Sequence, residues 1–409
     1  MPFSQFSLSQ KLVAALPDTF RSATEIQTLT IPAILNQQDV LAIAKTGSGK
    51  TLAYGLPLLE QLLAVSSHSQ ALILVPTREL ASQVNNTLSL VTQHTKLTSI
   101  SIFGGVDKEQ QKAALAKQPS VIVATPGRLL ELLTENAPMA SNINKLVLDE
   151  ADRLLEMGFW TDVQRIIEML PAKRQTLMFS ATFPKLLESK ANELLNSPAL
   201  IEAKKTEDAE PSINETLYLV NKGNKTKALI DQISRHNWRQ VLVFIGAKDN
   251  ADALCKKLNK AGLNTAALHG NKDQAEREAT LEQFKQQQIN VLIATDLLAR
   301  GIHVEQLPVV INFELPSSAE TYVHRIGRTA RAGQKGIAVS LVCHGETEYL
   351  TAIRKVTQRE LALQELDGFP VTDQPSSGES KRAPRDKQAN RRTNKKKSIK
   401  QFQGRTKRS

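Results

Sequence analysis

Cysteine is scarce in this chain of 409 residues, where only Cys255 and Cys343 occur. Two cysteines provide neither a disulfide framework nor a metal-ligand cluster. We therefore expect two buried thiols without a chemical role, in a cytoplasmic protein whose surroundings are reducing. Long apolar runs are also missing, because no segment approaches the roughly 20 residues that span a bilayer. The first residues have no basic leader, so we expect neither a signal peptide nor a membrane partner.

Aromatic residues are few as well, at 4% of the chain, although hydrophobic residues reach 41%. This balance is typical of a soluble globular protein, and the length is sufficient for two or three domains.

Acidic residues are scarce at the carboxyl end, where residues 372–409 contain 13 Lys or Arg and three acids. The other 371 residues contain 39 basic and 38 acidic side chains. Because this tail has almost no apolar residues, it cannot offset its ordering entropy and is predicted to be disordered. It is either a solvated tail that aids solubility or an arm that binds the phosphates of a nucleic acid whatever the base sequence. Counterion release favours the second interpretation.

Short apolar runs alternate with helix-like segments in the rest of the chain, a pattern that predicts parallel α/β sheets covered on both faces. The pattern restarts after a polar stretch, so we expect two similar α/β domains with a boundary near residues 204–212. Ligands bind beyond the carboxyl ends of such strands. The expected strands are 39–44, 71–76, 120–125, 145–150 and 176–181, and then 216–220, 240–246, 265–270, 290–296, 309–314 and 336–342.

The first strand end carries "AIAKTGSGKT", residues 42–51. Its glycines let the backbone curl so that N–H groups face inward, and Lys50 can then reach β and γ phosphates. Thr51 can hold Mg²⁺ at the start of the next helix. A flexible turn is the alternative, but GSGKT between a strand and a helix favours nucleotide binding. Ala44 stands where the general pattern has a glycine.

Another strand end, "KLVLDEADRL", places Asp149, Glu150 and Asp152 within four positions of one another. Carboxylates this close raise one another's pKa unless a cation lies between them. A Mg²⁺ ion held between Thr51 and Asp149 would be that cation, and Glu150 can orient the attacking water. Solvated loop acids are the alternative, which the upstream P-loop disfavours.

Three further strand ends combine a threonine that caps the next helix with an arginine close behind it. A helix amino terminus with a hydroxyl and a guanidinium is an anion socket. One alone would be an ordinary capped helix, but three over two domains predict a single polyanion that crosses both. The pairs are Thr77 with Arg78, Thr125 with Arg128, and Thr295 with Arg300.

The segment "YVHRIGRTARAG", residues 322–333, carries His324, Arg325, Arg328 and Arg331. Their spacing predicts that several share one helical face. A solvated basic stripe is the alternative. Facing a P-loop across a cleft, such arginines would stabilise the charge on a transferring phosphoryl group.

Together these segments resemble the DEAD-box family of RNA helicases, over about residues 3–345. The motif that names the family occupies residues 149–152, and "SAT" follows at 180–182. The resemblance implies two tandem RecA-like domains with parallel sheets, at residues 1–205 and 212–365, and a disordered basic tail at 366–409. The other motifs occur in the family's order: "PTREL", Gly104 with Gly105, "TPGR", "VFIGAK", "LHGNKDQAERE", "ATDLLARGI" and "HRIGRTARAG".

The family's adenine-reading segment is also present, as Phe3, Phe20 and "TEIQ" ending in Gln27. In the family the glutamine reads the adenine edge and an aromatic ring stacks on the base, which implies ATP rather than GTP. At His303 the family has an aspartate that accepts hydrogen bonds from the ribose. The milder departures are Thr19, Ala23 and Ala330.

Residue by residue, the resemblance implies the following site. The catalytic residues are Lys50, Asp149, Glu150, Arg328 and Arg331. ATP is bound by Phe20, Gln27, Thr46, Gly47, Ser48, Gly49, Lys50 and Thr51, and Mg²⁺ by Thr51 and Asp149. RNA is bound by Arg78, Gly105, Thr125, Arg128, Gln274, Arg277 and Thr295, and Asp152, Ser180 and Thr182 couple the two sites.

The sequence therefore predicts an RNA-dependent ATPase whose two domains close on ATP and RNA and separate short duplexes. An ATP-gated RNA clamp or annealing factor is a second possibility, and a DNA helicase a third, since phosphate sockets do not distinguish sugars. We expect a monomer that acts on RNA, including ribosomal or messenger ribonucleoprotein.

Overall fold

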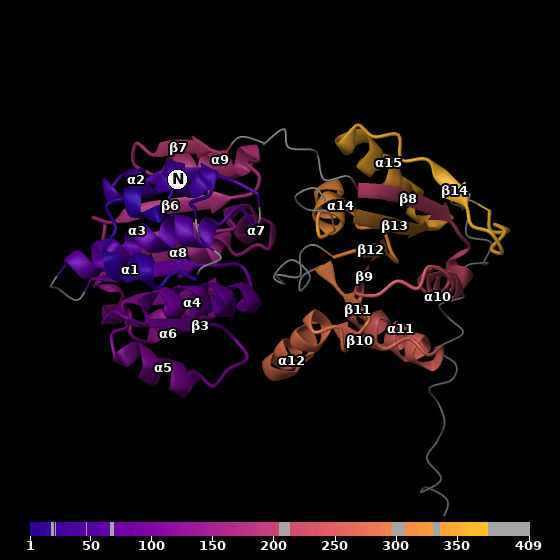
Figure 1. The fold of residues 1–409 in the computed structure, drawn as a ribbon, viewed down its shortest axis with the longest axis horizontal. Helices are drawn as coiled ribbons and strands as arrows, with labels where there is room; N and C mark the ends of the chain where they lie inside the picture. The colour runs from indigo at the N-terminus through magenta and orange to yellow at the C-terminus, as the bar shows by residue number, and fades with distance from the viewer. Residues whose placement is uncertain are drawn as a thin grey trace, which may run out of the picture.

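The protein is described from a computed structural model, which covers residues 1–17, 20, 22–45, 47–65, 69–203, 213–296, 307–329 and 336–374. These residues form two α/β bodies that stand side by side (Figure 1). Among them, two sheets of seven strands each are present, and every pairing is parallel. The predicted architecture of tandem RecA-like domains is confirmed.

The first domain has the strand order β3-β4-β2-β5-β6-β1-β7. Its strands are β1 (Val40–Ile43), β2 (Gln70–Leu74), β3 (Ser99–Ile102), β4 (Val121–Ala124), β5 (Ile143–Asp149), β6 (Gln175–Ser180) and β7 (Ala199–Glu202). Its α-helices are α1 (Gln10–Ala14), α2 (Glu25–Leu35), α3 (Lys50–Ala64), α4 (Arg78–Thr92), α5 (Lys108–Ala116), α6 (Pro126–Glu135), α7 (Ala151–Glu156), α8 (Trp160–Met169) and α9 (Lys185–Leu194).

Side chains of these strands alternate between two cores, because successive residues of a strand point to opposite faces. Ile73 and Val147 pack on the face that α2, α3 and α4 cover. Leu72, Leu74 and Leu148 pack on the face that α6, α8 and α9 cover. Both faces are therefore buried, which explains why the strands read as continuous apolar runs.

The second domain repeats this plan in the order β10-β11-β9-β12-β13-β8-β14. Its strands are β8 (Ile213–Leu219), β9 (Val241–Phe244), β10 (Thr265–Leu268), β11 (Val291–Ala294), β12 (Val309–Asn312), β13 (Gly336–Val342) and β14 (Leu363–Glu365). Its described α-helices are α10 (Lys225–Arg235), α11 (Lys248–Lys260), α12 (Gln274–Lys285), α14 (Ala319–Ile326) and α15 (Thr347–Thr357).

The folded chain extends past the predicted end of the second domain at residue 365. Leu366 is buried in the core of that domain. The Asn221 side chain donates to the Thr372 hydroxyl at 2.8 Å and accepts from the Asp373 backbone N–H at 3.0 Å. The predicted start of the disordered tail at residue 366 is therefore too early, and the rest of that predicted tail, residues 375–409, lies outside the described part.

No helix in the described ranges is long and apolar enough to cross a membrane. Both cysteines are free thiols; Cys343 is buried and Cys255 is partly buried. Burial raises the pKa of each thiol.

Candidate active site

The predicted site residues gather at the carboxyl ends of the central strands. β1 ends just before the P-loop, and β5 and β6 end at Asp149 and Ser180. β6 pairs with both β1 and β5, so these three ends meet at one edge of the sheet. In Figure 1, α7 lies on the side of the first domain nearest the second, and α12 and α14 lie on the side of the second domain nearest the first.

Two glycines with positive φ shape the P-loop, Gly47 at 76° and Gly49 at 92°. Other residues are strained in this left-handed region. α3 begins at Lys50, so the unpaired N–H groups of its first turn point back toward the loop. The Lys50 side chain is buried, and its Nζ donates to the Ala44 carbonyl at 3.2 Å. The loop therefore presents backbone donors and one buried ammonium group.

Three more predicted nucleotide ligands belong to this loop. The Ser48 hydroxyl is buried and finds no hydrogen-bond partner among the described residues. Thr51 is partly exposed in the first turn of α3. Thr46 lies outside the described part.

The predicted adenine-reading residue Gln27 is tied to the P-loop. Its Oε1 accepts from the Thr24 backbone N–H at 2.9 Å, and its Nε2 donates to the Gly49 carbonyl at 3.0 Å. A side chain at position 49 would collide with this amide, which is a second reason for glycine there. The predicted stacking residue Phe20 is 44% exposed, whereas Phe3 is buried in the core.

Asp149 is 3% exposed and both of its oxygens accept hydrogen bonds. Oδ2 accepts from the Tyr54 hydroxyl and Oδ1 from the Glu150 backbone N–H, both at 2.9 Å. Burial raises the pKa of Asp149, and the nearby Lys50 ammonium opposes this change. The carboxylate is thus held in one orientation beside the P-loop lysine.

Glu150 has a backbone conformation that is rare for a residue other than glycine, with φ 53° and ψ 50°. Such strain costs of order 1–3 kcal/mol and clusters at functional sites. The side chain is buried and accepts from Arg153 Nη1 at 2.6 Å. Glu150 therefore has a strained backbone directly after Asp149, and Arg153 fixes the Glu150 carboxylate.

The three predicted coupling residues are in contact. Asp152 Oδ2 accepts from the Thr182 backbone N–H at 2.9 Å and from its hydroxyl at 2.8 Å. The Asp152 backbone N–H donates to the Ser180 hydroxyl at 3.3 Å. The turn after β6 is therefore bound to the start of α7.

Thr182→Val is expected to weaken duplex separation more than ATP turnover, because it removes one hydrogen bond to the buried Asp152 carboxylate. Such a bond contributes about 1.5–3 kcal/mol. Both rates are measured on the same preparation, and Thr182→Ser, which keeps the hydroxyl, is the matched control. An unchanged ratio of the two rates would exclude a coupling role for this bond.

Arg78, the first residue of α4, lies against the backbone of Gly104 and Gly105, where side chains would collide with its guanidinium. Gly105 also has φ 89°. Thr77 caps α4 as predicted, since its hydroxyl accepts from the Leu80 N–H at 3.3 Å. Burial and then the nearby Arg128 guanidinium lower the pKa of Arg78.

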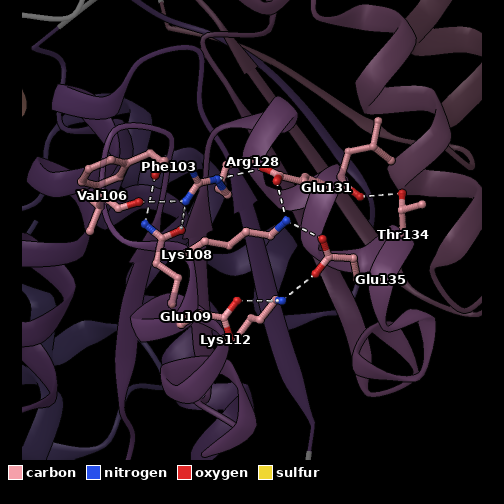
Figure 2. Close-up of polar contacts among 11 residues, drawn as sticks. Phe103, Val106, Lys108, Glu109, Lys112, Arg128, Glu131, Thr134 and Glu135 are labelled. Atoms are coloured by element: carbon pink, nitrogen blue, oxygen red, sulfur yellow. Dashed lines mark hydrogen bonds and ion pairs between the residues drawn. The ribbon is translucent and has the colours of Figure 1, made fainter.

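Arg128 belongs to a polar network between α5 and α6 (Figure 2). Its Nη1 donates to the Val106 carbonyl at 3.0 Å, and its Nε pairs with Glu131 at 3.1 Å. Lys108 pairs with Glu131 and Glu135, and Lys112 pairs with Glu135 and Glu109. The network fixes Arg128 beside the Gly105 loop. Thr125 precedes α6, but its side chain makes no capping hydrogen bond among the described residues.

Arg277 of the second domain reaches the first, where it forms an ion pair with Glu79. Both side chains are nearly buried, at 4% and 8% exposure. Burial, with Arg78 as the next cause, lowers the pKa of Arg277 to about 10. The structure therefore brings Arg78, Arg128 and Arg277 into one cationic cluster. Gln274, at the start of α12, is buried, and its Oε1 has no partner in the described part.

The prediction that the basic residues of 322–333 share one helical face fails for Arg328, because α14 ends at Ile326. Arg325 points inward instead: it pairs with Asp296 at 2.6 and 2.8 Å and donates to Asn312 Oδ1 at 3.0 Å. It thereby supports the turn after β11 that carries Thr295. Arg328 is buried beyond the helix. Arg331, Arg300 and His303 lie outside the described residues.

Sequence reasoning missed Tyr54, Arg153 and Glu79. Tyr54 follows Lys50 by one helical turn, so helical spacing would have placed it on the same face. Arg153 has the same relation to Glu150 at a spacing of three. Glu79 has no such signal, because its partner is 198 residues away.

Two RecA-like domains, a P-loop and paired acids after β5 define the class of P-loop nucleotide-binding proteins with tandem domains. Two family models match the chain: "DEAD/DEAH box helicase" at residues 24–189 and "Helicase conserved C-terminal domain" at 224–333. The DEAD-box ATP-dependent RNA helicase CshA of Geobacillus kaustophilus is 38% identical over 360 residues, which are 88% of this chain and 77% of the relative. CshA of Bacillus subtilis is also 38% identical, over 88% of this chain and 73% of the relative. This chain belongs to the DEAD-box helicase family.

Solved structures agree with this assignment. Saccharomyces cerevisiae Dbp5 bound to RNA and ADP BeF3 is 29% identical, with a TM-score of 0.78 over 89% of this chain and 95% of Dbp5. Mss116 bound to single-stranded RNA and UDP-BeF is 27% identical, with a TM-score of 0.79 over 90% of this chain and 80% of Mss116.

Proposed function

We propose that the protein is an RNA-stimulated ATPase that locally separates short RNA duplexes by ATP-driven closure of its two domains. The observation that carries the proposal is the buried ion pair between Arg277 of the second domain and Glu79 of the first, which brings Arg277 to the start of α4, where Arg78 lies close to Arg128. Like charges lower one another's pKa, and a phosphate backbone would relieve this repulsion. The polyanion would then join the domains. That this polyanion is RNA is supported by the relatives named as RNA helicases and by the similar structures bound to RNA.

The residues of the first domain fit ATP with Mg²⁺. The Thr51 hydroxyl and the Asp149 carboxylate are hard oxygen donors of the kind that Mg²⁺ prefers. Asp149 is buried, which raises its pKa, and the nearby Lys50 ammonium opposes this change. The site therefore already pairs a carboxylate with a cationic group. Bound Mg²⁺ would neutralise charge on the phosphates. Lys50 would hold the β and γ phosphates, Gln27 would bind the adenine edge, and Phe20 would stack on the base.

In the hydrolytic step, the carboxylates and arginines around the γ phosphate would have separate roles. Glu150 would orient the attacking water and accept its proton, from the strained position beside Asp149. Arg328 and Arg331 would approach the γ phosphate when the domains close and stabilise its developing charge. Asp152, with Ser180 and Thr182, would couple ATP hydrolysis and domain closure to the RNA-binding residues. If RNA favours the closed state, it must tighten ATP binding by the same factor.

Measuring ATP turnover with single-stranded RNA, single-stranded DNA or no nucleic acid, followed by displacement of a short RNA duplex, tests this function. We expect RNA alone to stimulate turnover and ATP to be required for displacement. Equal stimulation by DNA would favour a DNA helicase. Tight RNA retention with turnover but no displacement would indicate an ATP-gated clamp.

Removing the basic tail after Gln374 is expected to raise the RNA concentration that half-saturates the ATPase, with little change in the saturated rate. The tail carries 13 basic residues, and each neutralised phosphate adds to the salt dependence of binding. RNA binding is measured at several salt concentrations, where the truncated chain should give the shallower slope. The cut leaves the contacts of Thr372 and Asp373 intact. Equal slopes, or a large fall in saturated rate, would contradict this role.

A further inference from the structure

Tyr54 is a fully buried tyrosine whose hydroxyl points at the Asp149 carboxylate. Its exposure is 0%, and its hydroxyl donates to Asp149 Oδ2 at 2.9 Å. Burial raises the pKa of Tyr54 well above its usual value, with the Asp149 charge as the next cause. A tyrosine hydroxyl is neutral at ordinary pH, where its pKa is about 10, and as a hydrogen-bond donor it suits a carboxylate partner.

The position of the ring is fixed by packing. Tyr54 lies on α3 one turn after Lys50, and its ring contacts Phe179 edge-on with centroids 5.2 Å apart. Phe179 is the residue of β6 that pairs with Asp149 of β5. The ring thus rests on the strand beside Asp149.

The contact leaves Asp149 free to bind a further group. An ionised carboxylate has about four lone-pair sites, and here Tyr54 and the Glu150 N–H use one on each oxygen. Thr51 precedes Tyr54 by three residues on α3, so the two side chains share one face of the helix. Tyr54 is therefore bonded to one of the two side chains that would hold Mg²⁺ and shares a helix face with the other.

We propose that Tyr54 is a positioning residue that holds Asp149 in the orientation needed to bind Mg²⁺ with the nucleotide. This inference rests on the proposed function, in which Asp149 and Thr51 hold that ion. Tyr54 itself touches neither the ion nor the nucleotide in this scheme. It acts through the orientation of the carboxylate, which would otherwise lose one of its two fixed donors.

Tyr54→Phe keeps the ring on Phe179 and removes only the hydroxyl. In the full chain, binding of a fluorescent ADP analogue is measured across a Mg²⁺ titration and again in EDTA. We expect the Mg²⁺ concentration for half-maximal enhancement to rise about tenfold, since a hydrogen bond to an ionised group contributes at least that factor. Affinity in EDTA should not change. Mn²⁺ binding to the ADP complex, followed by paramagnetic resonance, should weaken in parallel.

Two other variants separate the possible outcomes. Tyr349→Phe alters a tyrosine that is 41% exposed on α15 and should match the unchanged protein. Asp149→Asn should abolish the Mg²⁺ enhancement. If Asp149→Asn abolishes it and Tyr54→Phe leaves it unchanged, the positioning role is overturned while the metal site stands. If Asp149→Asn has no effect, the metal assignment and this inference both fail. Equal loss of affinity with Mg²⁺ and in EDTA would show that Tyr54 has only a structural role.

Discussion

Glu150→Gln is expected to lower RNA-stimulated ATP turnover at least a hundredfold while ATP and RNA still bind. The amide keeps the shape of the side chain and can still accept from Arg153, but it cannot take a proton from water. General-base catalysis typically contributes about 10²–10⁴-fold. Steady-state turnover at saturating RNA, with separate measurements of nucleotide and RNA affinity, provides the comparison.

The matched control is Glu188→Gln, which neutralises a glutamate exposed on α9, outside the proposed sites. It should turn over ATP at the original rate. Turnover within a few-fold of the original in Glu150→Gln would remove Glu150 from the mechanism. Loss of nucleotide binding in the same variant would point instead to collapse of the strained turn after β5.

Lys50→Ala is expected to weaken ATP binding itself, by roughly 10–100-fold, because charge-assisted hydrogen bonds to phosphate contribute about 1.5–3 kcal/mol. Asp149 would also lose the cation that opposes its raised pKa, which weakens the site further. Equilibrium binding of ATP, measured without RNA, isolates this effect from domain closure.

Lys45→Ala provides the control, since Lys45 belongs to the same loop but is exposed to solvent. Its ATP affinity should remain close to that of the unchanged chain. An unaltered affinity in Lys50→Ala would contradict the phosphate role. A comparable loss in both variants would indicate a general electrostatic effect rather than a specific contact.

Much of the fold was predictable from local sequence. Strands buried on both faces must be apolar throughout, and this signature predicted β1, β2, β4, β5, β6 and most strands of the second sheet. The prediction omitted β3, β7 and β14, which are edge strands; β3 and β7 are partly buried and β14 is exposed. An edge strand faces less apolar surface and can carry polar residues, so "SISI" at Ser99–Ile102 gave no signal.

The nucleotide-binding part of the site was also determined locally. Gly47, Gly49 and Lys50 are adjacent in sequence, and positive φ at the glycines followed by a helix start is enough to form the loop. Contacts among Asp152, Ser180 and Thr182 were expected only from the family resemblance, because they join segments about 30 residues apart.

The tertiary structure alone decided which partner each remaining side chain has. Arg325 was grouped by its spacing with arginines expected near a phosphoryl group, but it lies within α14 and pairs with Asp296, where a bidentate contact compensates its burial. The ion pair of Arg277 with Glu79 and the bond of Tyr54 to Asp149 join residues 198 and 95 positions apart. Composition and periodicity report only local conformation and burial. The partner of a buried charged group depends on how distant segments pack. Because the core has low polarity, leaving such a group without a partner would cost several kcal/mol of stability.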